Sequence, residues 1–164
     1  MRDLIQNFRR YLDNTVLFTC SFALILLVIT VSWQVFSRYV LNDPSSFTDE
    51  LSRFTMIWLG LLGATYLFGK KGHLSITLLQ DALPKKAKLF LQTLINILML
   101  SFIYMAMFKG GIMLIGRTLQ QLSPALQIPM GYVYTILPIS AVISAIYIII
   151  NIIDHIYETT LKEE

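Results

Sequence analysis

The chain has 164 residues, of which 55% are hydrophobic and only 14% are charged, and its mean hydropathy is +0.65. This balance excludes a disordered chain and argues against a water-soluble domain, which would need more charge on its surface. The length allows one domain. The single cysteine, Cys20, excludes an intrachain disulfide framework, a cysteine-cluster metal site and any thiol chemistry that needs a cysteine pair.

Four long runs without charged residues predict four membrane-spanning helices, because about 20 residues cross the roughly 30 Å hydrocarbon core. The runs are continuously apolar rather than alternating, which favours helices over strands. We therefore expect an all-α integral membrane protein with one four-helix domain over residues 1–164. The expected spans cover about 14–38, 50–69, 89–116 and 130–153.

The segments between the spans carry their own signals. Residues Arg2–Asp13 form an amphipathic pattern that is typical of a short helix lying on the inner leaflet. Turn-forming residues fill 42–46, and Thr48 is the expected N-cap of the second helix. A second amphipathic segment, Leu74–Leu83, is expected to lie on the membrane surface. In the fourth span Pro138 predicts a kink.

The distribution of lysine and arginine predicts the orientation. The N-terminus, the middle loop and the C-terminus hold nine of these residues, whereas the other two loops hold three. We therefore expect both termini on the cytoplasmic side, with the first span acting as an uncleaved signal anchor. The same rule explains the basic middle loop, so no nucleic-acid partner is expected.

Charged residues gather at the expected outer edge. Arg38 ends the first span, Glu50 and Arg53 begin the second at positions i and i+3, and Lys109 is expected at a similar depth. Three interpretations fit: a structural clamp that includes contacts to a partner subunit, lipid headgroup contact, or a proton or substrate site. The third is disfavoured because the carboxylates lie at the span edges. Arg53 alone also fits an interfacial arginine that reaches the headgroups.

The second span carries Gly60, Gly63 and Ala64, and Gly60 and Ala64 form a small-xxx-small pair that lets another helix approach closely. We expect this face to be buried against protein, although glycines placed by chance remain an alternative. His73 stands far from the only other histidine, His155, so a capping or packing role is expected rather than metal binding. The chain has no nucleophile beside a base, no metal-ligand spacing and no phosphate-binding glycine loop, which predicts that it is not an enzyme.

Several stretches resemble a known family when their order and spacing on the four spans are taken together. They are Trp33–Tyr39, Phe47–Phe54, Trp58–Ala64 and Gly72–Ile76. This arrangement is similar to the small membrane subunit of the tripartite ATP-independent periplasmic (TRAP) transporters, the DctQ-like family. One departure is Phe47, where many relatives carry tryptophan. The second half matches mainly by hydropathy, together with Pro129–Gly131 and Pro138.

The resemblance implies a bacterial inner-membrane protein that packs against a large membrane subunit and widens its anchorage. In this family the large subunit carries the substrate and sodium sites, and a periplasmic binding protein delivers an organic acid. Sialic acid is our single expectation for the substrate, with other sugar acids and C4-dicarboxylates as alternatives. No cofactor is expected in this chain, sodium ions are expected in the large subunit, and membrane lipids are expected partners.

Two other functions stay open at this point. A self-sufficient small transporter that works as a homo-oligomer would turn Glu50 and Arg53 into site residues. A membrane-embedded enzyme is the third hypothesis, and the missing catalytic constellations disfavour it.

Overall fold

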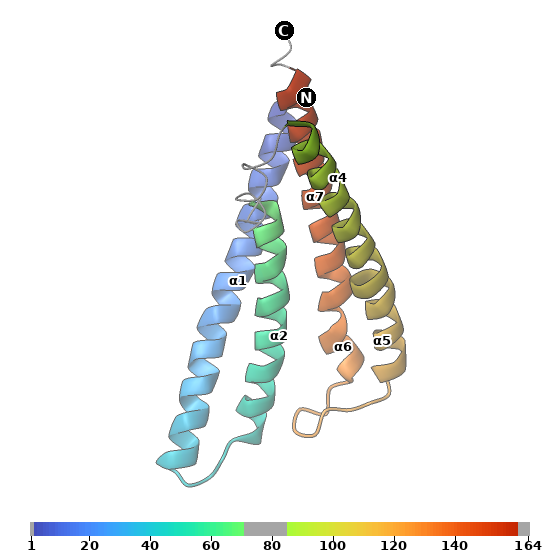
Figure 1. Cartoon of the computed structure of the whole chain (residues 1–164). Coiled ribbons are helices and arrows are strands. Elements are labelled where there is room, and N and C mark those ends of the chain that lie inside the picture. Colours follow the sequence, from blue (N-terminus) through green and yellow to red (C-terminus); the bar gives the residue numbers. More distant parts are fainter. Residues whose placement is uncertain (1, 71–84, 161–164) are drawn as a thin grey trace.

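The computed structural model describes the backbone of residues 2–70 and 85–160 and, within these ranges, the side chains of residues 5–70, 91 and 94–153. Its helices are α1 (Arg2–Tyr39), α2 (Ser46–Gly69), α4 (Lys85–Phe102), the π-helix η1 (Ile103–Lys109), α5 (Gly110–Thr118), α6 (Met130–Tyr134) and α7 (Ile136–Thr160) (Figure 1). Within these described residues, four stretches are long and apolar enough to cross a membrane: Ile5–Tyr39, Ser46–Gly69, Leu94–Thr118 and Met130–Ile153. The expected all-α class with four spans is confirmed.

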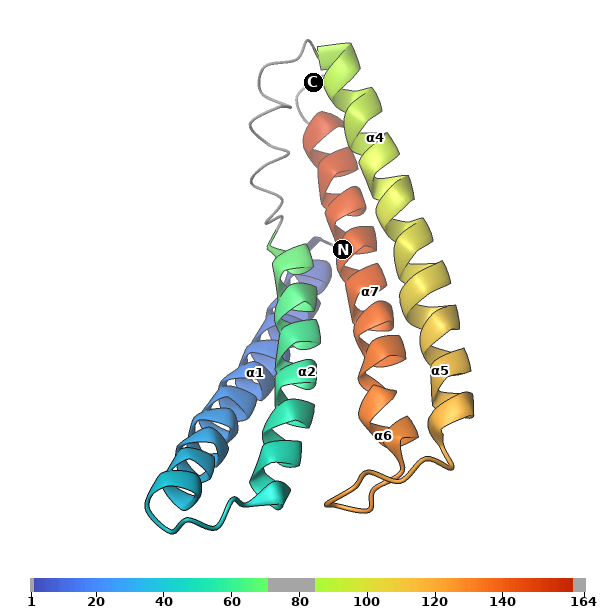
Figure 2. The ribbon, with the colours of Figure 1, turned by 60° about the horizontal axis from the view of Figure 1, so that its bottom comes forward.

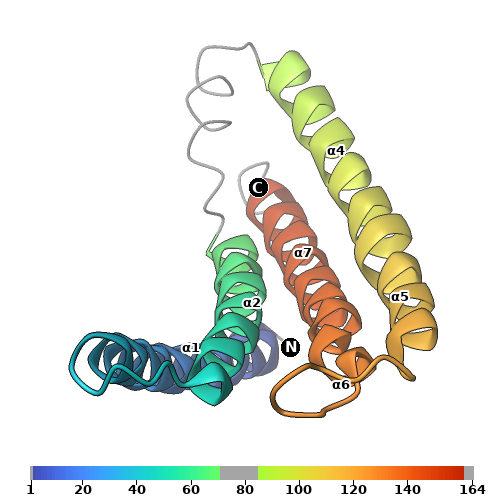
Figure 3. The same cartoon turned by 90° about the horizontal axis from the view of Figure 1, so that it is seen from below.

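The helices form an open row rather than a closed bundle. Contacts join α1 to α2, α2 to α7, and α7 to η1. Seen from below in Figure 3, α2 and α7 occupy the middle of the row, and α1 and α5 lie at its two edges. Figure 2 shows the same order from another side, with the loops 40–45 and 119–129 at one end of the molecule. We call this end the loop end. An open row leaves wide apolar faces that lipid or another protein must cover.

Buried residues at seven-residue intervals, most of them small or hydroxyl-bearing, line the contact of α1 with α2. They are Val16, Ala23, Thr30 and Ser37 on α1, and Thr48, Thr55 and Leu62 on α2. A seven-residue repeat keeps one side of each helix on its partner, and small side chains let the two backbones come close. The hydroxyl groups donate to carbonyls of their own helix, as Thr55 Oγ1 does to the Leu51 oxygen at 2.8 Å, so they need no partner across the interface.

The second half of the molecule packs through α7. Ile103, Ala141 and Ile148 form its buried apolar cluster. Gly111 permits a close approach to α7, because a Cβ atom there would lie 2.9 Å from the Leu137 Cβ atom. The wider turns of η1 keep Ile103 and Gly111 on the side that faces α7.

Several segment boundaries differ from the expected ones. The sequence contains no glycine or proline from Arg2 to Tyr39, so residues Arg2–Asp13 form the first turns of α1 rather than a separate helix. Ser45 is the N-cap of α2, and its side chain accepts from the Thr48 N–H, which corrects the expected cap at Thr48. The fourth span breaks at Thr135, close to the expected kink at Pro138. The expected surface segment Leu74–Leu83 and His73 lie outside the described residues.

Candidate functional site

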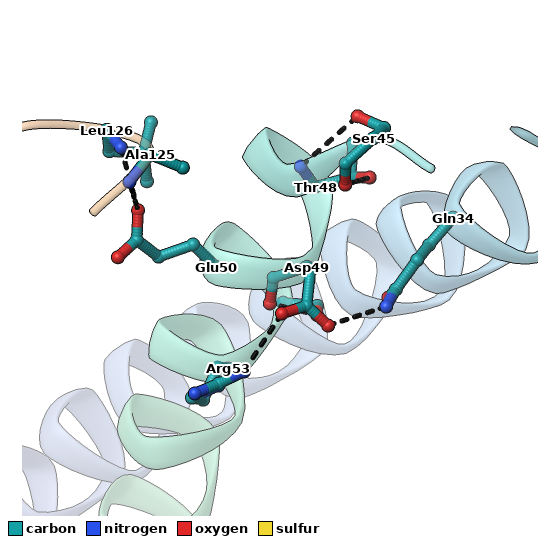
Figure 4. A network of polar contacts seen from close by, with 9 residues as sticks. Gln34, Ser45, Thr48, Asp49, Glu50, Arg53, Ala125 and Leu126 are labelled. Carbon is teal, nitrogen blue, oxygen red and sulfur yellow. Dashed lines mark hydrogen bonds and ion pairs between the residues drawn. The ribbon is translucent and has the colours of Figure 1, made fainter. Parts of the chain in front are cut away.

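At the loop end, Asp49 connects α2 to α1. Its Oδ1 atom accepts a hydrogen bond from Gln34 Nε2 at 2.6 Å, and its Oδ2 atom pairs with Arg53 Nη2 at 2.9 Å (Figure 4). Arg53 lies one turn beyond Asp49 on the same helix, and both side chains are largely exposed. An exposed i, i+4 ion pair contributes little to stability. The hydrogen bond from Gln34, which joins α1 to α2, is therefore the structurally important part of this contact.

Glu50 connects α2 to the loop 119–129. Its Oε2 atom accepts the backbone N–H groups of Ala125 at 3.0 Å and of Leu126 at 2.7 Å, as Figure 4 shows. Glu50 is only 9% exposed. The loop is preshaped for this contact, with Gln127 at a φ of 53° and a bridge between Leu122 and Pro129. Two backbone donors on one carboxylate oxygen are typical of an anion held by a turn.

These contacts correct the predicted arrangement of the charged cluster. The predicted Glu50–Arg53 pair is wrong, and Arg53 pairs with Asp49 instead. Glu50 is the next residue of α2, so its side chain leaves a different side of the helix and points toward the loop 119–129. Arg38 is exposed, and no hydrogen bond or ion pair joins it to another residue with a described side chain. A clamp at this end therefore exists, but Gln34, Asp49 and Glu50 build it. Sequence reasoning overlooked Gln34, whose amide forms the hydrogen bond between α1 and α2.

We expect Glu50→Leu to free the loop. Amide hydrogen exchange at Ala125 and Leu126 should rise by about tenfold or more, because a hydrogen bond to a charged acceptor contributes about 1.5–3 kcal/mol. The measurement is hydrogen–deuterium exchange with mass spectrometry on the protein in lipid nanodiscs. Arg53→Leu is the matched control and should leave this exchange unchanged. Equal effects of the two variants would support the Glu50–Arg53 pair instead.

At the opposite end, Asp13 joins three helices. Its Oδ1 atom accepts from the Tyr147 hydroxyl at 2.8 Å, and its Oδ2 atom accepts from Lys70 Nζ at 2.9 Å. Asp13 is 7% exposed and Tyr147 is completely buried. Lys70 also lies over the Tyr66 ring, 5.4 Å from its centre. The hydrogen bond to Asp13 raises the pKa of Lys70 above its usual 10.5, so this cation persists at physiological pH.

Further polar contacts surround Asp13. Arg9 donates to the Gly69 carbonyl, and Asn151 Nδ2 donates to the Phe68 carbonyl at 3.0 Å. One turn deeper, Ser144 Oγ donates to Thr65 Oγ1 at 3.2 Å. Together these bonds tie the end of α2 to α1 and α7. We call Asp13, Lys70 and Tyr147 the Asp13 triad. Sequence reasoning classed Asp13 as an edge carboxylate and missed this role. The sequence offered one signal for this role: Asp13 lies three residues before Val16, so it falls on the same side of α1 as the seven-residue repeat.

The remaining predicted residues do not join either group. Gly60 and Ala64 are exposed and Gly63 is half-buried, and a Cβ atom on either glycine would meet nothing within 4 Å. No described helix of this chain therefore packs on that face, and its expected protein partner stays a prediction. Lys109 is exposed at the end of η1. Instead, helices approach each other closely at Gly69, Gly111 and Gly131.

The polar contacts described at both ends join parts of this chain to one another. Among the described residues, no group of three or more histidine, cysteine or acidic side chains could hold a metal ion. Trp58 adds one more bond between helices, from its Nε1 atom to the Val133 carbonyl at 3.0 Å. Four spans joined by buried polar contacts define a helical integral membrane protein.

Comparison with known proteins gives the family. The family model "Tripartite ATP-independent periplasmic transporters, DctQ component" matches residues 27–157. The chain belongs to this family: it is a small TRAP permease subunit that partners a large permease subunit, and it is not an enzyme. The resemblance seen in the sequence is confirmed.

Individual relatives agree with this membership. A protein of Haemophilus influenzae named as a TRAP transporter small permease is 27% identical over 154 residues, which cover 94% of this chain and 95% of the relative. The sialic acid TRAP transporter small permease protein SiaQ of Vibrio cholerae is 37% identical over 65 residues, or 40% of this chain and 38% of SiaQ. The sialic acid TRAP transporter permease protein SiaT of Haemophilus influenzae is 27% identical over 77 residues, or 47% of this chain and 12% of SiaT.

Proposed function

We propose that this chain is the scaffold subunit of a sodium-coupled importer in the bacterial inner membrane, with both termini in the cytoplasm. It stabilises and anchors the large subunit, which binds the sodium ions and an organic acid delivered by a periplasmic binding protein. Sialic acid is the first substrate to test, because SiaQ and SiaT are among the relatives. Another sugar acid or a C4-dicarboxylate is the alternative.

One observation carries this proposal. A buried carboxylate at each end of the described row bonds to a distant part of the chain: Asp13 to Tyr147 and Glu50 to the 119–129 loop. A carboxylate already committed to two structural donors is poorly suited to bind and release a solute. The open row also leaves long apolar faces exposed, which suits a subunit that packs against a larger membrane protein and lipids.

Reconstitution in proteoliposomes tests the proposal. We expect uptake of labelled sialic acid only when this chain, the large subunit, the binding protein and an inward sodium gradient are all present. Variants of Glu50 and Arg53 that still assemble should keep the ratio of sodium ions to substrate. Uptake by this chain alone would support a homo-oligomeric transporter and would overturn the scaffold function. Uptake of another organic acid by the full system would correct only the substrate.

A further inference from the structure

Lys109 points away from the rest of the chain. It is the last residue of η1, two positions from both Met107 and Gly111, which lie toward α7. Two residues correspond to about half a helical turn, so Lys109 lies on the opposite side of the helix. Its side chain is exposed, and no hydrogen bond or ion pair joins it to another described residue.

Judged by helix length, Lys109 lies inside the third span, below the expected boundary of the hydrocarbon core. The third span covers Leu94–Thr118, so Lys109 lies 15 residues after its start and nine before its end. At about 1.5 Å per residue, its Cα atom is roughly 13 Å from the loop end of the helix. A charged side chain at such a depth needs an anionic or strongly polar partner, or a route to the headgroups.

The direction of the helix opposes the route to the headgroups. The Cα–Cβ bonds of a helix tilt toward its N-terminus, and the third span runs toward the loop end. The Lys109 side chain therefore leans away from the nearer membrane boundary. The Arg53 side chain leans the other way, toward the nearer membrane boundary, because its helix α2 starts at the loop end. Its guanidinium group bonds to Asp49, which lies one turn nearer that boundary.

The surface around Lys109 suits a helix. Met105, Met113 and Gly116 lie on the same side of the third span, and all three are exposed. A Cβ atom on Gly116 would meet nothing within 4 Å, so a second backbone has room beside it. Flexible methionines adapt to an irregular apolar partner, whereas a lipid phosphate would have to leave the interface to reach the ammonium group.

We propose that this face, defined by Met105, Lys109, Met113 and Gly116, docks a transmembrane helix of the large permease subunit, and that Lys109 pairs there with a carboxylate of that helix. The inference rests on the proposed scaffold function. The driving force is charge complementarity in a low-dielectric layer, where an unpaired cation is costly and a paired one is tolerated. The edge of the row would then be the interface between the two subunits.

Site-specific crosslinking tests this contact in the assembled complex. A photoreactive lysine analogue replaces Lys109 in native membranes, and the same probe replaces Phe22, an exposed residue of α1, as a control. We expect the probe at Lys109 to crosslink to a large-subunit peptide that contains aspartate or glutamate. Crosslinks only to phospholipid, or only to a second copy of this chain, would overturn the proposal.

Charge variants supply the second measurement. Lys109→Arg should keep the yield of the co-purified complex, and Lys109→Glu should lower it by at least about tenfold, because a repulsive pair replaces a buried attractive one. Lysine at the crosslinked acidic position of the large subunit should restore the yield of Lys109→Glu. An unchanged yield of the co-purified complex with Lys109→Glu would overturn the proposal. Failure of the wild-type chain to recover any large subunit would instead count against the scaffold function itself.

Discussion

Asp13→Ala should lower the free energy of unfolding by about 2–4 kcal/mol, because a buried hydroxyl that loses its partner costs about 1–3 kcal/mol and a charged hydrogen bond is lost as well. The unpaired hydroxyl is that of Tyr147, which is completely buried. Lys70 contributes less, because its side chain is 49% exposed and water can solvate the freed ammonium group. Thermal unfolding in mild detergent measures the loss.

The control for Asp13 is Asp43→Ala. Asp43 is exposed in the loop 40–45, and its carboxylate accepts no hydrogen bond from another described residue. Its removal should change stability by less than about 0.5 kcal/mol, as is usual for surface substitutions. The double variant of Asp13→Ala and Tyr147→Phe should lose less stability than the summed losses of the two single variants, since each single variant already removes the Asp13–Tyr147 hydrogen bond. Additive losses would contradict direct coupling in the Asp13 triad.

Gly69→Ala should destabilise the protein by about 2–3 kcal/mol, because the added methyl group overpacks a closed interface. Its Cβ atom would lie 2.6 Å from the Tyr147 Cε1 atom. The Tyr147 ring cannot move freely, since it is fully buried and its hydroxyl is bound to Asp13. The expected result is a lower midpoint of thermal unfolding and weaker docking of α7 on α2.

Gly60→Ala is the matched control on the same helix. A methyl group there would meet nothing within 4 Å, and alanine is the better helix former by up to about 1 kcal/mol. The isolated chain should therefore keep or slightly gain stability. A loss at Gly60 as large as at Gly69 would contradict the packing described here. A loss of complex yield without a loss of chain stability would instead indicate that a partner helix covers Gly60.

Residues of the charged cluster show how far the sequence reasoning reached. Glu50, Arg53 and Arg38 were correctly placed at one end of the helices, because helix length and hydropathy determine depth. Their pairing was not predictable, since Asp49 and Glu50 are adjacent and differ only in the side of the helix they occupy. The loop 119–129 decides between them by presenting the Ala125 and Leu126 N–H groups to Glu50.

Asp13 shows a different limit. Its sequence neighbours identify an acidic residue near the start of a long apolar run, and its register shows which side of α1 it occupies, but neither identifies its partner. Tyr147 lies 134 positions away, and only the docking of α7 across the end of α2 brings the two side chains to 2.8 Å. Likewise, on α2 the tightly packed glycine is Gly69 rather than Gly60 of the Gly60–Ala64 pair, because the Tyr147 ring of α7 lies against it.

By itself, the sequence determined that this chain is an all-helical, four-span membrane protein without a catalytic constellation, because the bilayer requires long apolar helices and charge is scarce. It also indicated the TRAP small-subunit family through the order of its short motifs. Only the tertiary structure decided which polar groups meet, that the helices form an open row, and that Lys109 faces outward. Those features depend on helix rotation and on contacts between distant residues, and an unpaired polar group in a dry environment is costly enough to select one arrangement.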